Sequence, residues 1–232
     1  MKKIGIIGGI GPESTLDYYR GIIDGVRRKS GDDLHYPDIV IFSADLIDLI
    51  RILEDDAMDE LAEWLLTRIA ALQRAGADFA AIASNAPHMV FEEVVTRSPL
   101  PLLSIVEETC RKAESLGVRR VGLMGTKFTM EADFFQRPFL ERGMTVVVPA
   151  ADEQKYIHDK LFSEIELGII KDSTRKGLLA IAGKMAARDG IEAMILGCTE
   201  LPLILNRAEF GIPYLNTTAI HVEGIVRHCL AP

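Results

Sequence analysis

The sequence has few cysteines and no long apolar run. Its 232 residues include three cysteines, at positions 110, 198 and 229, which are too few and too scattered for a disulfide framework. Because no Cys-x-x-Cys or paired His/Cys spacing occurs, we expect no bound metal. The apolar stretch after Lys3 is too short for a signal peptide, and no run reaches the roughly 18 residues that a membrane helix needs. Free thiols fit a reducing compartment, so we expect a cytoplasmic protein with no membrane partner.

Positive charge is in deficit. The formal net charge is −8, with 48% hydrophobic and 26% charged residues, which is an ordinary composition for a globular protein. This balance argues against nucleic acid or an anionic membrane as a partner, whereas a small molecule in a local cleft is compatible with it. Linkers and low-complexity tracts are also missing, so a boundary between domains must be a tight crossover.

The sequence does contain an internal repeat. Gly76-Ala-Asp-Phe-Ala-Ala-Ile-Ala-Ser84 recurs as Gly190-Ile-Glu-Ala-Met-Ile-Leu-Gly-Cys198, an offset of 198 − 84 = 114 positions. Two further matches have similar offsets, 2–8 against 119–125 and 101–104 against 213–216. Three ordered matches at nearly one spacing predict a duplicated α/β unit, and duplicated units usually pack with pseudo-twofold symmetry.

Short apolar runs alternate with longer amphipathic ones, which is typical of parallel sheets covered by helices. Strands are expected at 3–7, 38–43, 78–83, 101–104, 120–124, 145–148, 193–196 and 213–215. Helices are expected at 12–30, 56–75, 104–116, 130–142, 154–167, 172–188 and 216–230, most of them ending near a glycine. The predicted fold class is therefore α/β, with two similar Rossmann-like domains that contain parallel sheets and are related by pseudo-twofold symmetry. We place the first domain at 1–107 plus 213–232 and the second at 108–212, because the second repeat is complete near residue 212.

Ser84 and Cys198 each stand just past the end of an expected strand, where open parallel sheets bind their ligands. Residues suited to a helix start follow both of them. A helix N-terminus binds carboxylates and lowers the pKa of a cysteine from about 8.5. Two proton-handling groups on opposite faces of one small molecule are what inversion of a stereocentre requires, and the symmetry of the repeat predicts that arrangement for Ser84 and Cys198.

Each of these residues also has a structural interpretation. A free cysteine is most often a small buried apolar residue, and serine is a good helix N-cap. Asn85 suits a turn. His88 lies one helical turn past Ser84, where it could assist a proton transfer or serve as a structural histidine. The strand-end position, the Thr-Glu that follows it and the repeat partner favour a functional role for Cys198.

Four segments carry a resemblance when taken together in order: Gly8-Gly-Ile-Gly-Pro-Glu-Ser-Thr15 with Tyr18-Tyr19, Ser84-Asn-Ala-Pro-His88, Gly125-Thr-Lys-Phe-Thr-Met130 and Gly197-Cys-Thr-Glu200. Over nearly the whole chain they resemble the aspartate/glutamate racemase family of cofactor-independent amino-acid racemases. The resemblance implies an active site between two domains, no cofactor, and commonly a homodimer. It also implies that Ser84 and Cys198 are the acid/base residues. Further residues would bind the substrate: Asn85, Ala86, Thr126 and Thr199 at its α-carboxylate, and Arg51 at its side chain.

The sequence departs from the family pattern at informative positions. Most members carry cysteine at both acid/base positions, whereas a subgroup that prefers L-aspartate or L-glutamate carries threonine at the first, which Ser84 resembles. A serine hydroxyl is a poor base at neutral pH, so we expect Cys198 to be the main base and turnover to be asymmetric. Ala86 removes one hydroxyl donor from the carboxylate site. Glu166 stands where aspartate racemases tend to have lysine, and an acidic group there would repel an acidic side chain.

The sequence therefore predicts a cofactor-independent amino-acid racemase that acts on aspartate or glutamate, with the Cys198 thiolate as main base and Ser84 on the opposite face. One alternative is a non-catalytic or weakly active binding protein on the same fold. Another is a superfamily enzyme that acts on a different carboxylate, such as a hydantoin racemase or a maleate isomerase. Dinucleotide binding is disfavoured, because Ser14 replaces the third glycine of the fingerprint and the acidic residue expected about 20 positions later is missing.

Overall fold

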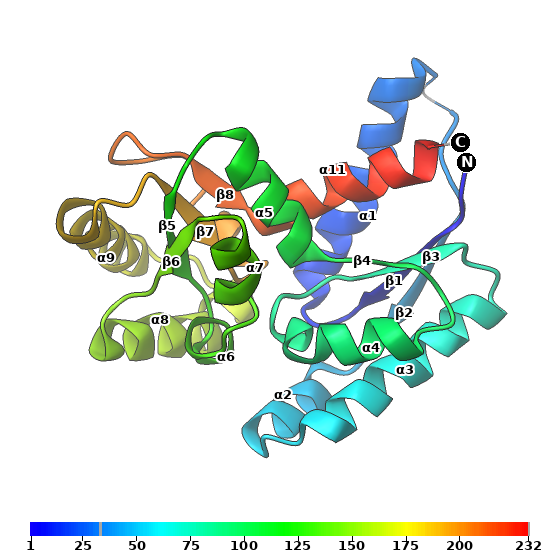
Figure 1. Cartoon of the computed structure of the whole chain (residues 1–232), viewed down its shortest axis with the longest axis horizontal. Coiled ribbons are helices and arrows are strands. Elements are labelled where there is room, and N and C mark those ends of the chain that lie inside the picture. The colour runs from blue at the N-terminus through cyan, green and yellow to red at the C-terminus, as the bar shows by residue number, and fades with distance from the viewer. Residues whose placement is uncertain (33, 232) are drawn as a thin grey trace. The chain divides into compact units, whose positions relative to one another are not determined.

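The computed structural model describes residues 1–32 and 34–231, and its contacts divide them into two compact units. The first unit comprises Met1–Glu108 and the C-terminal segment from Thr218, and the second comprises Thr109–Thr217. Each unit contains a sheet of parallel strands with flanking helices (Figure 1). The predicted α/β class with two similar parallel-sheet units is thus confirmed. Among the described residues, no helix combines the length and the hydropathy needed to cross a bilayer.

The sheet of the first unit has the strand order β2-β1-β3-β4. Its strands are β1 (Ile4–Gly8), β2 (Ile39–Ser43), β3 (Phe79–Ile82) and β4 (Leu102–Leu103), and every neighbouring pair is parallel. The central strands β1 and β3 are buried along their whole length, as expected where helices cover both faces. The helical elements are α1 (Pro12–Ser30), α2 (Leu46–Glu54), α3 (Met58–Arg74), the 3-10 helix η1 (Ala86–Val90), α4 (Phe91–Arg97), the first turn of α5 (Ile105–Ser115) and α11 (Thr217–Leu230).

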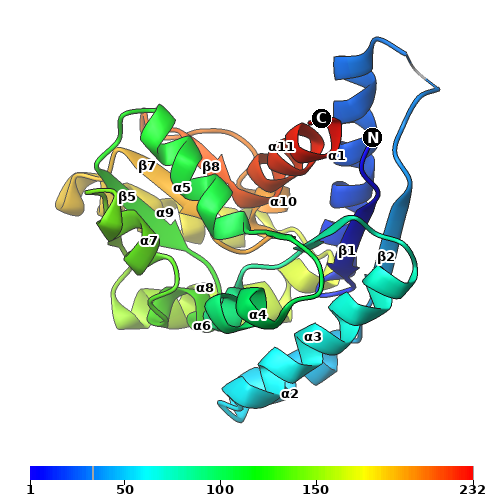
Figure 2. The ribbon, with the colours of Figure 1, turned by 45° about the vertical axis from the view of Figure 1, so that its right-hand side comes forward.

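Alternation along β1 separates the two faces of this sheet. Ile4 and Ile6 pack with residues of α1 and α11, whereas a side chain at the intervening Gly5 would meet Leu72 of α3. Both views show α1 beside α11 (Figures 1 and 2). A Cβ atom at Gly25 of α1 would lie 2.8 Å from Val226 of α11. The glycine therefore allows the two helices to approach closely over the sheet.

The second unit repeats this topology with the strand order β6-β5-β7-β8. Its strands are β5 (Arg120–Met124), β6 (Thr145–Val147), β7 (Ala193–Leu196) and β8 (Tyr214–Asn216), again all parallel. Its helical elements are the rest of α5, α6 (Lys127–Glu131), α7 (Gln136–Glu141), α8 (Ala151–Ser163), the 3-10 helix η2 (Ile165–Leu167), α9 (Asp172–Asp189) and α10 (Leu201–Ile204). Residues of α8 and α9, including Ile157, Leu161 and Leu178, pack with Met194 and Leu196 of β7 to form its core.

The acidic residue of the repeated segment makes the same contact in both units. Asp78, just before β3, accepts a hydrogen bond from the backbone N–H of Lys3 (2.6 Å). Glu192, just before β7, accepts from the backbone N–H groups of Arg119 (2.6 Å) and Arg120 (2.9 Å). Each carboxylate thus ties the entrance of one central strand to its neighbour. The repeat detected in the sequence is therefore a repeated structural contact as well as a repeated strand.

The expected strands agree with the structure, with shifts of one or two residues at their ends. The helices were predicted less well. The helix expected at 130–142 is wrong, because the structure has two short helices, α6 and α7, that are separated by residues 132–135. The helix expected at 56–75 corresponds to α3, but α2 before it was missed, as were α4 and α10.

Candidate active site

In the first unit, Ser84 lies at the carboxyl end of the sheet, in the loop that follows β3. The backbone N–H of Ala83 donates to the carbonyl of Ile7 (2.9 Å), so the loop starts beside the end of β1. Ser84 is partly exposed, whereas Asn85 and Ala86 are buried. The chain then forms η1, a 3-10 helix of five residues, before α4 begins. Such a short helix offers only a small aligned dipole, so the helix terminus expected after Ser84 is weak.

His88 and His221 form a buried, uncharged pair in the same unit. The Nε2 atom of His221 lies 3.0 Å from the Leu103 carbonyl, which can only accept, so Nε2 carries the proton and Nδ1 accepts from the Tyr18 hydroxyl (2.7 Å). The His88 ring stacks on Phe91, and its nitrogens make no hydrogen bond of good geometry within the described structure, although the nearby backbone of Asn85 and Ser84 opposes part of the shift in its pKa. Burial lowers the pKa of His88 to about 4 and that of His221 to about 3. Both imidazole rings are therefore uncharged near neutral pH, and neither carries the extra proton that a general acid would donate.

Arg51, expected to read the substrate side chain, lies on α2 and is exposed. Its guanidinium bonds to Glu60 and lies 3.6 Å from Asp55. The hydrogen bond to Glu60 raises the pKa of Arg51 further. The guanidinium group of Arg51 is thus paired with two carboxylates of its own unit.

In the second unit, Cys198 lies two residues past β7 and is surrounded by carboxyl groups. Its Sγ donates to Oε2 of Glu200 (3.2 Å) and lies 3.5 Å from Oε1 of Glu166. The Thr199 hydroxyl donates to the same Oε2 of Glu200 (2.7 Å). Glu200 precedes α10, whereas Glu166 comes from the middle of η2. The fold therefore brings two acidic residues from separate elements to one sulfur atom.

These carboxyl groups reverse the expected electrostatics of Cys198. Burial, together with the charges of Glu200 and Glu166, raises the pKa of the Cys198 thiol well above its usual value. The Glu200 backbone N–H opposes this shift, as a helix start should, but α10 has only four residues and its effect is smaller. The expectation of a lowered thiol pKa was therefore wrong, because the sequence near Cys198 does not reveal the carboxylates that the fold adds.

Thr126 lies in the second unit near the Cys198 loop. A Cβ atom at Gly125 would come within 2.9 Å of the Gly197 carbonyl, so the turns that follow β5 and β7 touch each other. Thr126 is buried, and its hydroxyl lies 3.3 Å from that of Thr129. Of the predicted site residues, Thr126, Cys198 and Thr199 thus gather at the carboxyl end of the second sheet. Ser84, Asn85, Ala86 and Arg51 belong to the first unit.

Comparison with known proteins identifies the family of this chain. The family model for Asp/Glu/Hydantoin racemases matches residues 7–225. The chain belongs to this family. The resemblance to aspartate/glutamate racemases that was read from the sequence motifs is therefore confirmed.

Similar proteins match this chain over nearly its full length. The broad-specificity amino-acid racemase RacX of Bacillus subtilis is 25% identical over 98% of this chain and 98% of its own. Among solved structures, an aspartate racemase homologue from Pyrococcus horikoshii is 34% identical with a TM-score of 0.85. A candidate Asp/Glu racemase from Yersinia pestis is 31% identical with a TM-score of 0.90. Both structures match over 100% of each chain.

One cluster in this racemase-family chain has the spacing of a cation site. The ligand atoms of Glu166, Cys198 and Glu200 all lie within 4.8 Å of one another. Zinc would require the thiolate form of Cys198, and burial together with the adjacent carboxylates disfavours that form. The arrangement is better described as a cluster of acids that share protons.

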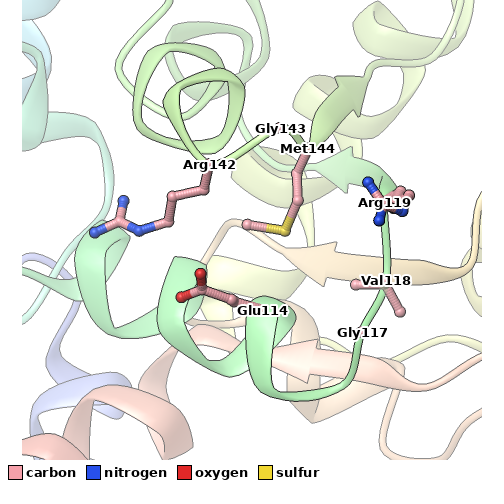
Figure 3. Close-up of a pocket in the computed structure, with 7 residues that line it drawn as sticks. All are labelled: Glu114, Gly117, Val118, Arg119, Arg142, Gly143 and Met144. Atoms are coloured by element: carbon pink, nitrogen blue, oxygen red, sulfur yellow. The ribbon is translucent and has the colours of Figure 1, made fainter.

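Two hollows lie away from the strand ends that carry the predicted site. One, of about 150 Å³ in the second unit, is lined by residues that precede β5 and β6, with Met144 pointing into it and Arg142 extending outward (Figure 3). The other, of about 690 Å³ in the first unit, is lined by residues around Lys2, Asp78 and Pro101, before β1, β3 and β4. Both are at the amino ends of the strands, whereas ligands of parallel sheets bind at the carboxyl ends. Neither hollow is a candidate for the racemase site.

Sequence reasoning missed the contact of Glu200 with the sulfur. The signal available was its position two residues after a strand-end cysteine, inside the Gly197-Cys-Thr-Glu200 segment. Glu166 was noted as an acidic departure from the family pattern, but its contact with Cys198 spans 32 positions and only the fold reveals it.

Proposed function

We propose that this chain is a cofactor-independent amino-acid racemase that inverts Cα by removing and returning a proton. Cys198 acts on one face of Cα, and the Ser84 hydroxyl acts on the other. The observation that carries the proposal is the position of these residues within the family's fold. Each follows the same strand of its unit, β3 or β7, at the end of the sheet where ligands bind.

The contacts of Cys198 suggest how it becomes a base. At rest the thiol is protonated and donates to Glu200. When an amino acid binds, Glu200 takes the thiol proton and the sulfur takes Hα, so the thiol is restored. The electron pair of the broken C–H bond moves into the substrate carboxylate, which gains enolate character. Donors directed at that carboxylate stabilise the developing charge.

The second proton transfer completes the inversion. The Ser84 hydroxyl delivers a proton to the opposite face of Cα and regains one from water, to which it is partly exposed. Glu200 then returns its proton to solvent, so the net change is inversion alone. Because serine is a weak base, removal of Hα from the Ser84 side should be slower than removal by Cys198.

The substrate is an α-amino acid whose carboxylate meets Asn85, Ala86, Thr126 and Thr199. The buried Thr126 supplies a hydroxyl, as does Thr199 if it turns from Glu200. Aspartate and glutamate are the first substrates to test, because several similar proteins are named for them. Arg51 reads an acidic side chain if it exchanges Glu60 for the substrate. We further propose that the active protein is a cytoplasmic homodimer, as is common in the family.

Exchange of Hα with deuterium tests this proposal directly. The protein is incubated in deuterium oxide with each enantiomer of alanine, aspartate, glutamate and lysine, and the Cα proton is followed by NMR. We expect exchange that is faster from one enantiomer than from the other. Equal exchange from both enantiomers would contradict the asymmetric roles of Ser84 and Cys198. No exchange with any amino acid would favour the alternative, a binding protein on a racemase fold, for which Ser84 and Ala86 are the motivating residues.

A further inference from the structure

Glu200 has one carboxylate oxygen that the protein leaves without a donor. The residue is only 2% exposed, and its Oε2 accepts from Cys198 and Thr199. Its other oxygen, Oε1, is buried and accepts no hydrogen bond from an N–H, hydroxyl or thiol group of the described residues. The Glu166 carboxyl can donate to Glu200 only while it is protonated. A buried carboxylate oxygen without a donor is unfavourable unless a ligand or a proton covers it.

Glu166 adds a second carboxyl group that also lacks a cation. It is partly exposed, so a molecule at Cys198 can reach it. Over residues 1–32 and 34–231, neither Glu166 nor Glu200 takes part in an ion pair. Lys160 and Lys171 bind Glu164 instead, at 2.7 and 3.2 Å. The fold thus places two acidic groups beside the reactive sulfur and directs the neighbouring lysines elsewhere.

The resting site compensates with a proton. Burial, followed by the neighbouring charge of Glu200, raises the pKa of Glu166 to about 8. Glu166 therefore carries a proton at neutral pH, and a protonated carboxyl can donate to Glu200. Two adjacent carboxyl groups that share one proton are the expected result when they are largely removed from water and have no cation beside them.

We propose that Glu166 and Glu200 form an ammonium subsite beside Cys198, which selects free amino acids over N-acylated or hydantoin-type substrates. The inference rests on the proposed function, in which Hα meets the Cys198 sulfur. The α-nitrogen is one bond from Cα, so carboxylates within 3.5 Å of that sulfur can reach it. An ammonium group on a side chain is the second possible source of the same chemistry. In either case the arriving cation replaces the shared proton, which Glu166 releases to the solvent.

Calorimetric titration tests the subsite without requiring turnover. The ligands are alanine, N-acetylalanine, lysine and Nα-acetyl-lysine, each titrated into the wild-type protein and into Glu166→Gln. In wild type at pH 7 we expect alanine to bind with release of close to one proton, measured in buffers of different ionisation enthalpy. Glu166→Gln should weaken alanine binding about 10- to 100-fold and abolish the release. Glu141→Gln removes one exposed acid from the same unit and should change neither quantity.

The acetylated ligands identify the source of the ammonium. Loss of binding when alanine is acetylated assigns the subsite to the α-ammonium. Binding of Nα-acetyl-lysine that depends on Glu166 assigns it to the side chain. If N-acetylalanine binds as tightly as alanine and the binding of Nα-acetyl-lysine does not depend on Glu166, or if Glu166→Gln binds every ligand as wild type does, the subsite does not exist.

The two proposals fail separately. Absence of Cα exchange with intact, Glu166-dependent binding would remove the racemase mechanism and leave the ammonium subsite. Exchange in N-acetylalanine as fast as in alanine, together with ligand binding that does not depend on Glu166, would remove the subsite and leave the racemase mechanism.

Discussion

The loops after β3 and β7 occupy equivalent places in the two sheets, yet they handle protons in opposite ways. In the first unit Ser84 is followed by His88, which burial keeps neutral. In the second unit Cys198 touches two carboxyl groups that hold its thiol in the protonated form. The duplication has preserved the backbone and the acidic contact at the strand entrance, while the chemistry at the strand exit has diverged.

This difference also gives the units opposite responses to pH. The buried histidines of the first unit resist protonation, so that unit becomes less stable as the pH falls. The half-buried Glu166 of the second unit resists ionisation, so that unit becomes less stable as the pH rises. Each response can be changed by a single substitution, and so can the catalytic asymmetry.

The largest effect is expected from removing the sulfur. Cys198→Ala should slow Hα exchange from both enantiomers by about 10²- to 10⁴-fold, because the only thiol in the proposed site is lost. Ser84→Ala should slow exchange mainly from the enantiomer whose Hα faces Ser84. Exchange is followed by NMR in deuterium oxide, with Cys229→Ala as a control for loss of a buried thiol. Equal defects in Cys198→Ala and Ser84→Ala would show that the two loops are functionally equivalent.

The next effect concerns the stability of the first unit in acid. The folded pKa of His88 is about 4, below the ordinary 6.5, so the unfolded chain binds a proton that the folded chain excludes. This difference removes about 3 kcal/mol of stability as the pH falls from 6.5 to 4. His88→Phe keeps the ring stacked on Phe91 and should escape that loss. Urea unfolding at pH 7, 5.5 and 4 measures the free energy of unfolding of each variant. His35→Phe, at an exposed histidine, is the control. If the unfolding free energies of wild type and His88→Phe change in parallel with pH, the pKa of His88 is not lowered in the folded protein.

A smaller gain is expected when the two loops are made alike. Ser84→Cys places a far more acidic group after β3, and we expect exchange from the slow enantiomer to rise about 10- to 100-fold. The fold places the carboxyl groups of Glu166 and Glu200 at the loop after β7, so we expect the new thiol after β3 to be the easier one to ionise. Its pKa can be followed by the pH dependence of alkylation in Ser84→Cys/Cys198→Ala. If the thiol at position 84 has a higher pKa than the Cys198 thiol, the loop after β7 is the one that favours the thiolate, contrary to our expectation.

Local pattern predicted the strands and the duplication because both depend on short segments. The sequence itself shows the apolar runs of β1, β3, β5 and β7. It also shows the glycines that precede β3 and β7, which are Gly76 and Gly190. The helix between residues 130 and 142 was mispredicted because its apolar spacing continues across a turn at 132–135. Only two residues separate the end of β2 from the start of helix α2. Its signals in the sequence were Asp45, which caps the Ile47 N–H, and apolar residues at helical spacing.

The raised pKa of the Cys198 thiol could not be predicted from the local sequence. A strand-end cysteine before a helix start predicts a stabilised thiolate, and the Glu200 backbone N–H does act in that direction. Glu166, however, reaches the sulfur from a 3-10 turn 32 positions earlier. Within that turn, Glu164 bonds to Lys160, Lys171 and Thr174, which lower its pKa to about 2, whereas Glu166 has its pKa raised to about 8. Two glutamates two residues apart thus differ because of tertiary contacts.

A further stability effect sharpens the comparison from the side of the second unit. In the folded protein Glu166 keeps its proton up to about pH 8, whereas in the unfolded chain it ionises near 4.5. Wild type is therefore progressively destabilised between those values, and Glu166→Gln, which mimics the protonated acid, should be spared. Each kcal/mol so gained raises Tm by about 2–4 °C in a chain of this size. Calorimetric scans should show a higher Tm for Glu166→Gln at pH 7.5 and no difference at pH 4, with Glu141→Gln unchanged at both. If the Tm of Glu166→Gln is equal to or below that of wild type at pH 7.5, the prediction fails. The Glu166 carboxyl group would then be ionised and stabilised in the folded protein, so that replacing it brings no gain in stability.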